Sequence, residues 1–339
     1  MSKISSPKIS IVIPTFNSEK YIATCLDSIL QQTFQDFEII VIDDCSTDRS
    51  SEIVESYDDS RIELYRQIKN SGESDSRNLG LKIAQGKYIY FMDHDDAILP
   101  DTLEIFYNAA EESQSEVVLM NSYFYSNDSE FTLTDEIDVY QRFFENPTPR
   151  FLSADLSERI QQEYIEWGTY VTPWIRIQRR DFLFENQIYF PKTTLNGDVL
   201  FHFAELCLAR KIQVIDACGY IHRVHSSRTM NSPFEKRLQK ALTSMPIALK
   251  FLDSIFKNSR VNSVFDPQIK IQLESECISR FFNEYIIKSL DGEIDSEKIN
   301  ELIDQIVHKS QMFSPGLMRV LINTLSTAMI QLKFQGGTS

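Results

Sequence analysis

Three aspartates lie within four residues at the end of an apolar segment. The run from Tyr88 to Met92 is aromatic and aliphatic, and Asp93, Asp95 and Asp96 follow it directly. Like charges held this close repel one another, so they need a partner of opposite charge. Divalent cations prefer carboxylate oxygens, and Mg²⁺ or Mn²⁺ keeps several positions for water or substrate. The cluster therefore predicts a site for a divalent cation.

A second acidic pair lies at the end of another predicted strand. Asp43 and Asp44 follow the apolar residues 37–42. Ligands of parallel sheets bind outside the carboxyl ends of the strands, so the two acidic groups are expected to converge on one crevice. Helix capping is the alternative interpretation, and for Asp48 both interpretations stay open. One cap needs one side chain, so capping does not explain all three aspartates that follow Met92.

Strand and helix signals alternate along the first 120 residues. Short β-branched or aromatic runs predict strands at residues 9–14, 37–42, 61–65, 88–92 and 116–120. Repeats at helical spacing predict helices after Asn17, a candidate N-cap, and at residues 49–57, 74–85 and 100–113. The alternation predicts an α/β fold with a mostly parallel twisted sheet flanked by helices. No period is evident in residues 121–165, and the pattern is helical from residue 233 onward.

Composition excludes some classes of partner. The chain has 339 residues and a formal net charge of −15, which argues against nucleic acid because phosphate backbones are bound by basic patches. The five cysteines are scattered and form no Cys-x-x-Cys pair, which predicts reduced thiols. The sequence contains no apolar run of about 18 residues and no signal-peptide core. These features predict a cytoplasmic protein that does not span a membrane.

The sequence contains several short motifs in a fixed order. They are Ile-Val-Ile-Pro-Thr-Phe-Asn at 11–17, Ser-Ile-Leu-Gln-Gln-Thr at 28–33, Glu-Ile-Ile-Val-Ile-Asp-Asp-Cys-Ser-Thr-Asp at 38–48, Asn-Ser-Gly at 70–72, Ser-Arg-Asn-Leu-Gly at 76–80 and Phe-Met-Asp-His-Asp-Asp at 91–96. Together they resemble family 2 of the glycosyltransferases, which are inverting enzymes with the GT-A fold. The resemblance is to bacterial members that build cell-surface polysaccharide or glycoprotein glycans. Cys45 stands where the family usually has glycine, and Asp75 replaces a small apolar residue.

The resemblance implies a UDP-sugar site at the end of the first two strands. Thr15 and Asp44 are implied to contact the nucleotide base, with Asp44 accepting a hydrogen bond from the uracil N3–H group. Pro14, Phe16 and Asp43 are implied to line the same pocket.

The resemblance also implies roles around the diphosphate and a bound Mn²⁺ or Mg²⁺ ion. Arg77 either faces the diphosphate or steadies the acidic cluster. Asp95 ligates the metal with Asp96 assisting, and Asp93 reaches the ribose or the metal and its water. His94 is disfavoured as a ligand because neighbouring side chains on an extended segment point to opposite sides.

Inversion requires a base that takes the proton of the acceptor hydroxyl as it attacks. Asp198 precedes an apolar helical pattern, where the helix dipole favours an anion, and the family carries its acidic base at such a position. A plain N-cap is the alternative. Trp174 either stacks on a sugar or belongs to the core, and His225 or Arg228 is implied to approach the diphosphate. A zinc site at His222 and His225 is rejected because further ligands are missing nearby.

The expected organisation has three parts. Residues 1–120 form the nucleotide-sugar-binding half of the catalytic domain, residues 121–232 its acceptor-side half, and residues 233–339 a helical C-terminal region. Residues 308–334 carry three Lys or Arg side chains, no Asp or Glu, and an apolar face. Three interpretations of this segment stay open: peripheral contact with the inner face of the membrane, a homodimer interface, or a buried helix.

The leading functional hypothesis is metal-dependent inverting transfer of a hexose or N-acetylhexosamine from a UDP-sugar. The acceptor is expected to be a glycan, a lipid-linked sugar or a glycoprotein. A sugar-nucleotide pyrophosphorylase is the first alternative, but that class usually opens with a glycine-rich loop, which residues 14–17 lack. A non-catalytic nucleotide- or carbohydrate-binding module is the second, and the intact acidic cluster and Asp198 weigh against it.

Overall fold

The computed structural model describes residues 6–126, 140–143, 148–166, 172–193, 197–224, 234–265, 267 and 269–273. The chain divides into two compact units. The first comprises Met1–Phe190 and Phe201–Ser226, and the second Pro191–Leu200 and Ser227–Ser339. All described strands belong to the first unit. The three-part division expected from the sequence stays a prediction.

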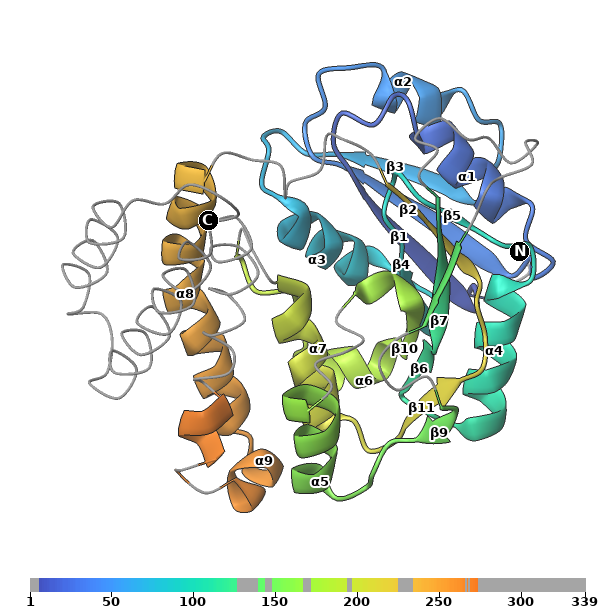
Figure 1. Ribbon diagram of the computed structural model, residues 1–339. Coiled ribbons are helices and arrows are strands. Elements are labelled where there is room, and N and C mark those ends of the chain that lie inside the picture. The colour runs from blue at the N-terminus through green and yellow to red at the C-terminus, as the bar shows by residue number, and fades with distance from the viewer. Residues whose placement is uncertain are drawn as a thin grey trace, which may run out of the picture. The chain divides into compact units, whose positions relative to one another are not determined.

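An eight-stranded sheet forms the centre of the first unit, in the order β3-β2-β1-β4-β10-β6-β11-β9 (Figure 1). Its strands are β1 (Ile9–Thr15), β2 (Phe37–Asp43), β3 (Ile62–Arg66), β4 (Tyr88–Phe91), β6 (Val117–Met120), β9 (Arg150–Phe151), β10 (Arg176–Arg179) and β11 (Ile212–Ile215). The first four strands are parallel, and β11 is parallel to β6. Strand β10 runs antiparallel to both β4 and β6. The predicted α/β sheet with flanking helices is thus confirmed.

Helices cover both faces of this sheet. In the first unit they are α1 (Ile22–Leu30), α2 (Ser50–Glu55), α3 (Glu73–Ile83), α4 (Thr102–Ser113), α5 (Leu156–Ile160), the π-helix η1 (Gln161–Glu166), the 3-10 turn η2 (Pro173–Ile175) and α6 (Arg180–Glu185). Helix α7 (Gly197–Leu208) begins in the second unit and continues into the first. Helix α3 packs on β1 and β2, and it lies on the opposite face of the sheet from α1 and α4 (Figure 1).

The predicted start of the first helix is wrong. Helix α1 begins at Ile22. Its N-cap is Tyr21, which lies four residues after Asn17. Asn17 instead adopts a left-handed backbone conformation with φ 51°, which its short polar side chain tolerates. Its amide oxygen accepts a hydrogen bond from the Thr47 backbone N–H at 2.8 Å. The residue therefore ties two turns together rather than capping a helix.

The strands that lead to the acidic residues are completely buried. Every residue of β1, β2 and β4 is buried, as near-continuous apolar runs in a sheet covered on both faces should be. Gly80 of α3 allows this cover to be close, because an added Cβ would lie 2.3 Å from Val12 Cγ1 of β1. The ends of β2 and β4 are therefore fixed by packing on both faces.

A second, four-stranded sheet has the order β5-β12-β7-β8. Its strands are β5 (Ala97–Ile98), β7 (Ser122–Ser126), β8 (Tyr140–Phe143) and β12 (Tyr220–Arg223). Strand β5 follows the acidic residues directly and pairs antiparallel with β12. The sequence predicted no element in residues 121–165, yet the described part of that segment contains β7, β8, β9 and α5. The second sheet matters for function because it places β12 beside the aspartates.

Two buried arginines hold the carboxyl-terminal half of α7. Arg159 has no exposed surface, and its guanidinium donates to the carbonyl oxygens of Leu206 at 3.1 Å and Ala209 at 2.6 Å. A cation at this position also complements the helix dipole. Arg176 of β10 pairs with Glu205, with 2.5 Å between Nη1 and Oε2 and no exposure on either side chain.

Replacing Glu205 with glutamine is expected to destabilise the protein by about 3 kcal/mol at pH 7, because it leaves the Arg176 charge buried without its counter-ion. Burial alone raises the pKa of Glu205, but the Arg176 charge and hydrogen bonds from His202 and Arg176 outweigh it and lower this pKa. The stabilisation is therefore fully present above the ordinary value of about 4.3 and is lost as pH falls through the folded-state value.

Urea unfolding at several pH values measures this effect. The difference between wild type and Glu205→Gln should shrink below about pH 4. Glu52→Gln is the matched control, because its ion pair with Arg49 is 70–76% exposed and should contribute little at any pH. A pH-independent difference at Glu205 would contradict the assigned charge pairing.

In the second unit, α8 (Phe234–Phe256) and α9 (Ser259–Val264) confirm the helical pattern predicted from residue 233, as far as that region is described. Residues 308–334 and Cys277 lie outside the described residues. Cys25, Cys45, Cys207 and Cys218 are all free thiols. Among the described residues, the helices are too short or too polar to cross a bilayer.

Candidate active site

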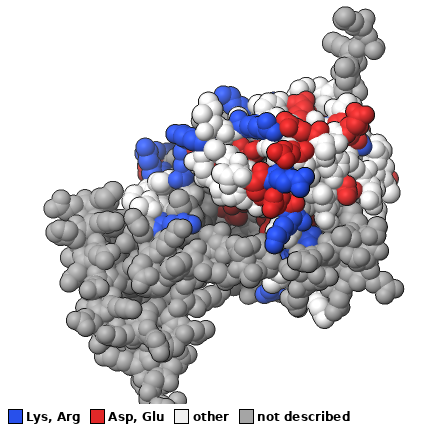
Figure 2. All heavy atoms as spheres, turned by 90° about the horizontal axis from the view of Figure 1, so that it is seen from above, with Lys and Arg blue, Asp and Glu red and all other residues white. Residues whose placement is uncertain are grey.

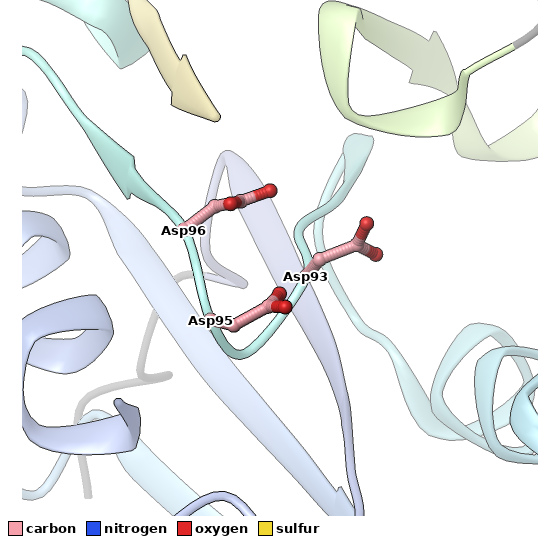
Figure 3. Close-up of side chains that lie close together, drawn as sticks. All are labelled: Asp93, Asp95 and Asp96. Carbon is pink, nitrogen blue, oxygen red and sulfur yellow. The ribbon is translucent and has the colours of Figure 1, made fainter. Parts of the chain in front are cut away.

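The acidic turn, residues 93–96, connects β4 of the large sheet to β5 of the small one. Oxygen atoms of Asp93, Asp95 and Asp96 all lie within 4.8 Å of one another, and the three carboxylates extend to the same side of the turn (Figure 3). Asp93 and Asp95 are partly exposed, whereas Asp96 is fully buried. An oxygen-only donor set of this spacing suits a hard divalent cation.

Asp96 receives hydrogen bonds only from β12 among the contacts the structure gives it. Its Oδ2 accepts from the Tyr220 hydroxyl at 2.5 Å and lies 3.0 Å from His222 Nδ1, and its Oδ1 accepts from the Arg223 backbone N–H at 2.7 Å. Burial and the negative charge of Asp95 raise the pKa of Asp96, although His222 partly opposes them. Burial is the larger of these causes, and the Asp95 charge adds to it.

Arg77 of α3 pairs with Asp93. Its Nη2 atom lies 2.7 Å from Asp93 Oδ1 and 2.5 Å from Glu73 Oε1. The guanidinium is buried and lies over the ring of Phe190, 5.2 Å from its centre. Of the two roles expected for Arg77, the geometry supports the steadying of the acidic turn. Because one oxygen of Asp93 is engaged by Arg77, the other is better placed to meet a ligand.

Asp43 and Asp44 hold the loops around the end of β2. Asp44 accepts hydrogen bonds from the backbone N–H groups of Ser71 and Gly72, both at 2.7 Å, and from Gln67 Nε2 at 3.0 Å. Asp43 accepts from the Ser46 N–H and the Ser51 hydroxyl. Both carboxylates are buried and belong to no metal-ligand group among the described residues.

The end of β1 connects the two acidic groups. His94 Nδ1 lies 3.0 Å from the Pro14 carbonyl oxygen, so its ring donates there. The Asp44 backbone N–H donates to the Thr15 carbonyl oxygen at 2.8 Å. Since β1 lies between β2 and β4 and all three are parallel, both groups occupy the same edge of the sheet. The predicted shared edge is therefore observed.

The side chains expected to contact the base differ in exposure. Phe16 is 43% exposed and presents an aromatic face at this edge. Thr15 is 2% exposed, and its hydroxyl has no hydrogen-bond partner within the described residues. Buried polar atoms are normally paired, so an unpaired hydroxyl beside an exposed aromatic ring is a feature typical of a ligand site.

Two turns at this edge, residues 15–19 and 43–50, exchange hydrogen bonds and are called the paired turns below. Asn17 N–H donates to Ser46 Oγ at 3.0 Å, and Ser18 N–H to Ser50 Oγ at 2.7 Å. Glu19 N–H donates to Asp48 at 3.0 Å, while Asp48 also accepts from Ser50, the first residue of α2. Asp48 therefore has the structural role that was one of its two interpretations.

Cys45 in the second of the paired turns has φ 66°, a conformation that favours glycine. Cys45→Gly is expected to stabilise the protein by about 0.5–1 kcal/mol, because about 1–2 kcal/mol of steric strain is relieved and part of it is offset by unfolded-chain entropy. Urea unfolding measures the change. Cys218→Gly is the control: its φ is not positive, so it should destabilise. A loss of stability in Cys45→Gly would contradict the strain argument.

The remaining sequence-predicted residues are placed separately. Asp198 lies in the first turn of α7, as predicted, and belongs to the second unit. Trp174 is 5% exposed and stacks on Tyr220 at 4.2 Å, so it belongs to the core rather than to an open sugar site. His225 and Arg228 lie outside the described residues. Tyr220, which contacts Asp93 and Asp96, and Glu73, which pairs with Arg77, went unnoticed in the sequence because neither belongs to a recognisable motif.

The face seen from above in Figure 2 carries side chains of both charges. Asp and Glu side chains gather among the described residues there, with Lys and Arg interspersed. A binding face for a phosphate backbone is instead continuously basic. The local positive charges are few, so a metal ion would add substantially to the attraction of a diphosphate.

Comparison with known proteins identifies the class of the molecule. Residues 10–184 match the family described as glycosyl transferase family 2. GlyG of Streptococcus pneumoniae is 29% identical over 238 residues, which cover 68% of this chain and 75% of GlyG. EpsJ of Bacillus subtilis, an uncharacterised glycosyltransferase, is 30% identical over 240 residues, 70% of this chain and 67% of EpsJ. TarS of Staphylococcus aureus, a poly(ribitol-phosphate) β-N-acetylglucosaminyltransferase, is 29% identical over 80% of this chain and 48% of TarS.

Comparison with solved structures indicates the same class of protein. The crystal structure of residues 1–349 of S. aureus TarS with UDP has a TM-score of 0.68 at 24% identity and covers 98% of this chain and 92% of that one. The complex of the same fragment with UDP-GlcNAc has a TM-score of 0.56 at 25% identity and covers 92% and 90%. The fold and the relatives together define a glycosyltransferase of the GT-A type. This chain belongs to glycosyltransferase family 2, as its motifs had indicated.

Proposed function

We propose that this chain is a metal-dependent, inverting transferase that moves a hexose or N-acetylhexosamine from a UDP-sugar. The relative TarS supports the choice of donor, because its fragment was crystallised with UDP and with UDP-GlcNAc. The acceptor we propose is a growing glycan, a lipid-linked sugar or a glycoprotein. TarS acts on a poly(ribitol-phosphate) polymer, which supports a cell-surface glycan in particular.

The observation that carries the proposal is the acidic turn at the carboxyl end of β4. One oxygen from each of the three carboxylates lies within 4.8 Å of the other two, and Asp95 and Asp93, which have solvent access, are the proposed ligands of Mn²⁺ or Mg²⁺ with Asp96 assisting them. A divalent cation bound there would stabilise the charge that develops on the departing diphosphate. Arg77 supports this geometry by fixing Asp93.

The nucleoside is proposed to bind at the end of β1 and β2. Phe16 offers an exposed aromatic face to the base, and the Thr15 hydroxyl supplies an unpaired polar atom. Asp44 would accept from the uracil N3–H with a lone pair left over from its three loop contacts. Pro14 and Asp43 are assigned supporting positions, since Pro14 holds His94 and Asp43 holds the turn that follows β2.

Asp198 is proposed as the general base. Single displacement at the anomeric carbon requires the acceptor hydroxyl to lose its proton as its oxygen attacks. A carboxylate in the first turn of α7 can accept that proton, and the helix dipole stabilises the anion before the reaction. The acceptor oxygen bonds to the anomeric carbon as the bond to the UDP oxygen breaks on the opposite face of the sugar. The proton of the acceptor hydroxyl passes to Asp198.

A UDP-release assay tests the proposed function. The protein is incubated with a panel of UDP-sugars and Mn²⁺, with and without EDTA, and free UDP is measured. Slow hydrolysis of one donor that EDTA abolishes is the expected result. Formation of UTP from UDP-sugar and pyrophosphate would favour a pyrophosphorylase instead. UDP binding without any turnover in the presence of candidate acceptors would favour a binding module.

Two further expectations remain proposals. We place the enzyme in the cytoplasm, where UDP-sugars are made and where the four free thiols would stay reduced. The C-terminal region is proposed to contribute either peripheral membrane contact or a homodimer interface. Co-sedimentation with anionic vesicles and light scattering at several protein concentrations separate these two roles.

A further inference from the structure

Strand β12 contacts three of the four residues of the acidic turn. The Tyr220 hydroxyl, besides donating to Asp96, lies 3.4 Å from the Asp93 backbone nitrogen and accepts from it. Arg223 Nε donates to the Asp95 carbonyl oxygen at 2.7 Å. Antiparallel pairing of β12 with β5 sets the register that brings these groups together. The turn is therefore held from one side by a single strand.

Aromatic stacking fixes the two β12 side chains that reach Asp96. Trp174 lies nearly parallel to the Tyr220 ring, with 4.2 Å between centres and 11° between planes. It also stacks on His222 at 5.3 Å and 17°. Tyr123 packs edge-on against Trp174 at 5.0 Å. Neither the Tyr220 hydroxyl nor the His222 imidazole can turn away from Asp96 without breaking this stack.

Asp96 differs from its two neighbours in burial and in bonding. It has no exposed surface and accepts from three β12 groups, whereas Asp93 and Asp95 are partly exposed. A metal ligand that keeps positions for substrate must lie where the substrate can reach the ion. We propose that Asp96 is a positioning residue: Tyr220 and His222 hold its carboxylate so that the turn presents Asp95 and Asp93 to the cation.

His222 is the second side chain that holds Asp96. The Nδ1 atom of His222 lies 3.0 Å from Asp96 Oδ2, and the histidine side chain is 24% exposed. Groups that support metal ligands from behind typically contribute 10–100-fold in metal affinity. The inference rests on the proposed function, since it concerns how the proposed cation site is held.

Binding of Mn²⁺ in the presence of UDP tests the inference without any activity measurement. Free Mn²⁺ is followed by its electron paramagnetic resonance signal in titrations of the full chain. Tyr220→Phe and His222→Leu are each expected to weaken Mn²⁺ binding by about 10-fold. His222→Asn should recover most of the wild-type affinity, because its amide can donate to Asp96 from nearly the Nδ1 position. Asp96→Asn should resemble Tyr220→Phe, while Asp95→Asn should abolish binding.

Tyr88→Phe is the matched control, because it removes a tyrosine hydroxyl of β4 that bonds to Glu111 of α4, and it should leave Mn²⁺ affinity unchanged. Thermal unfolding of each variant checks that it is folded; should His222→Leu not fold, the isosteric Tyr220→Phe decides. Wild-type affinity in Tyr220→Phe together with lost binding in Asp96→Asn would overturn the inference, since Asp96 would then be a ligand itself. Failure of wild-type protein to bind Mn²⁺ with UDP would overturn the proposed function as well.

Discussion

Replacing Asp198 with asparagine is expected to slow sugar transfer by about 10²–10⁴-fold while leaving the affinity for UDP unchanged. Asparagine has nearly the same shape and can still accept hydrogen bonds at the start of α7, so the helix should form normally. It cannot take the proton of the acceptor hydroxyl, and that step belongs to the transition state alone. The loss should therefore appear in kcat.

Transfer to acceptor is measured by UDP release, and UDP affinity by calorimetry. Asp155→Asn is the matched control: Asp155 caps α5 by accepting from the Glu158 N–H, so the same substitution there tests capping without chemistry. Neither the stability nor the turnover of the Asp155→Asn variant should change appreciably. Full activity in Asp198→Asn would leave Asp198 as a helix cap and remove it from the mechanism.

Replacing Asp95 with alanine is expected to abolish metal-dependent turnover, by on the order of 10³-fold or more. A cation that neutralises a leaving group contributes several kcal/mol to the transition state, and each 1.36 kcal/mol is tenfold in rate. Asp95 is a partly exposed carboxylate of the acidic turn, and its oxygens lie within 4.8 Å of those of Asp93 and Asp96. Its removal should also abolish Mn²⁺ binding, so excess metal should rescue little of the activity.

The rate of UDP release is measured over a range of Mn²⁺ concentrations. Asp101→Ala serves as the control because it removes the same charge from an exposed position beyond the turn, at the start of α4. That variant should keep wild-type kinetics. EDTA-insensitive turnover in the wild type, with Asp95→Ala equally active, would exclude the metal from the reaction.

The edge of the large sheet where β1, β2 and β4 end could be predicted from the sequence because these strands consist mostly of apolar residues. Strands β1, β2 and β4 are buried along their whole length, so hydrophobic runs mark them, and the aspartates that follow are placed by the end of each run. Parallel pairing then brings the ends together. The acidic turn was for this reason predictable as a site before any geometry was known.

Strands β10 and β12 contain polar and charged residues, so hydrophobic patterns do not predict them. Strand β10 contains Arg176 and Gln178, both fully buried, and Arg176 is acceptable inside only because Glu205 neutralises it. Strand β12 contains His222 and Arg223, which bond to the acidic turn. The positions of these side chains depend on partners far away in sequence, so no local window reveals them. The second sheet and its contacts to Asp96 were missed for that reason.

The paired turns carry an evolutionary consequence. Side-chain oxygens of Ser46, Asp48 and Ser50 accept from the backbone N–H groups of residues 17–19, and those of Asn17 and Glu19 accept from the N–H groups of Thr47 and Arg49. Losing one of these side chains leaves an N–H group of the opposite turn without its acceptor, so single substitutions there should be poorly tolerated. The two segments should therefore be exchangeable between related enzymes as a pair rather than one at a time.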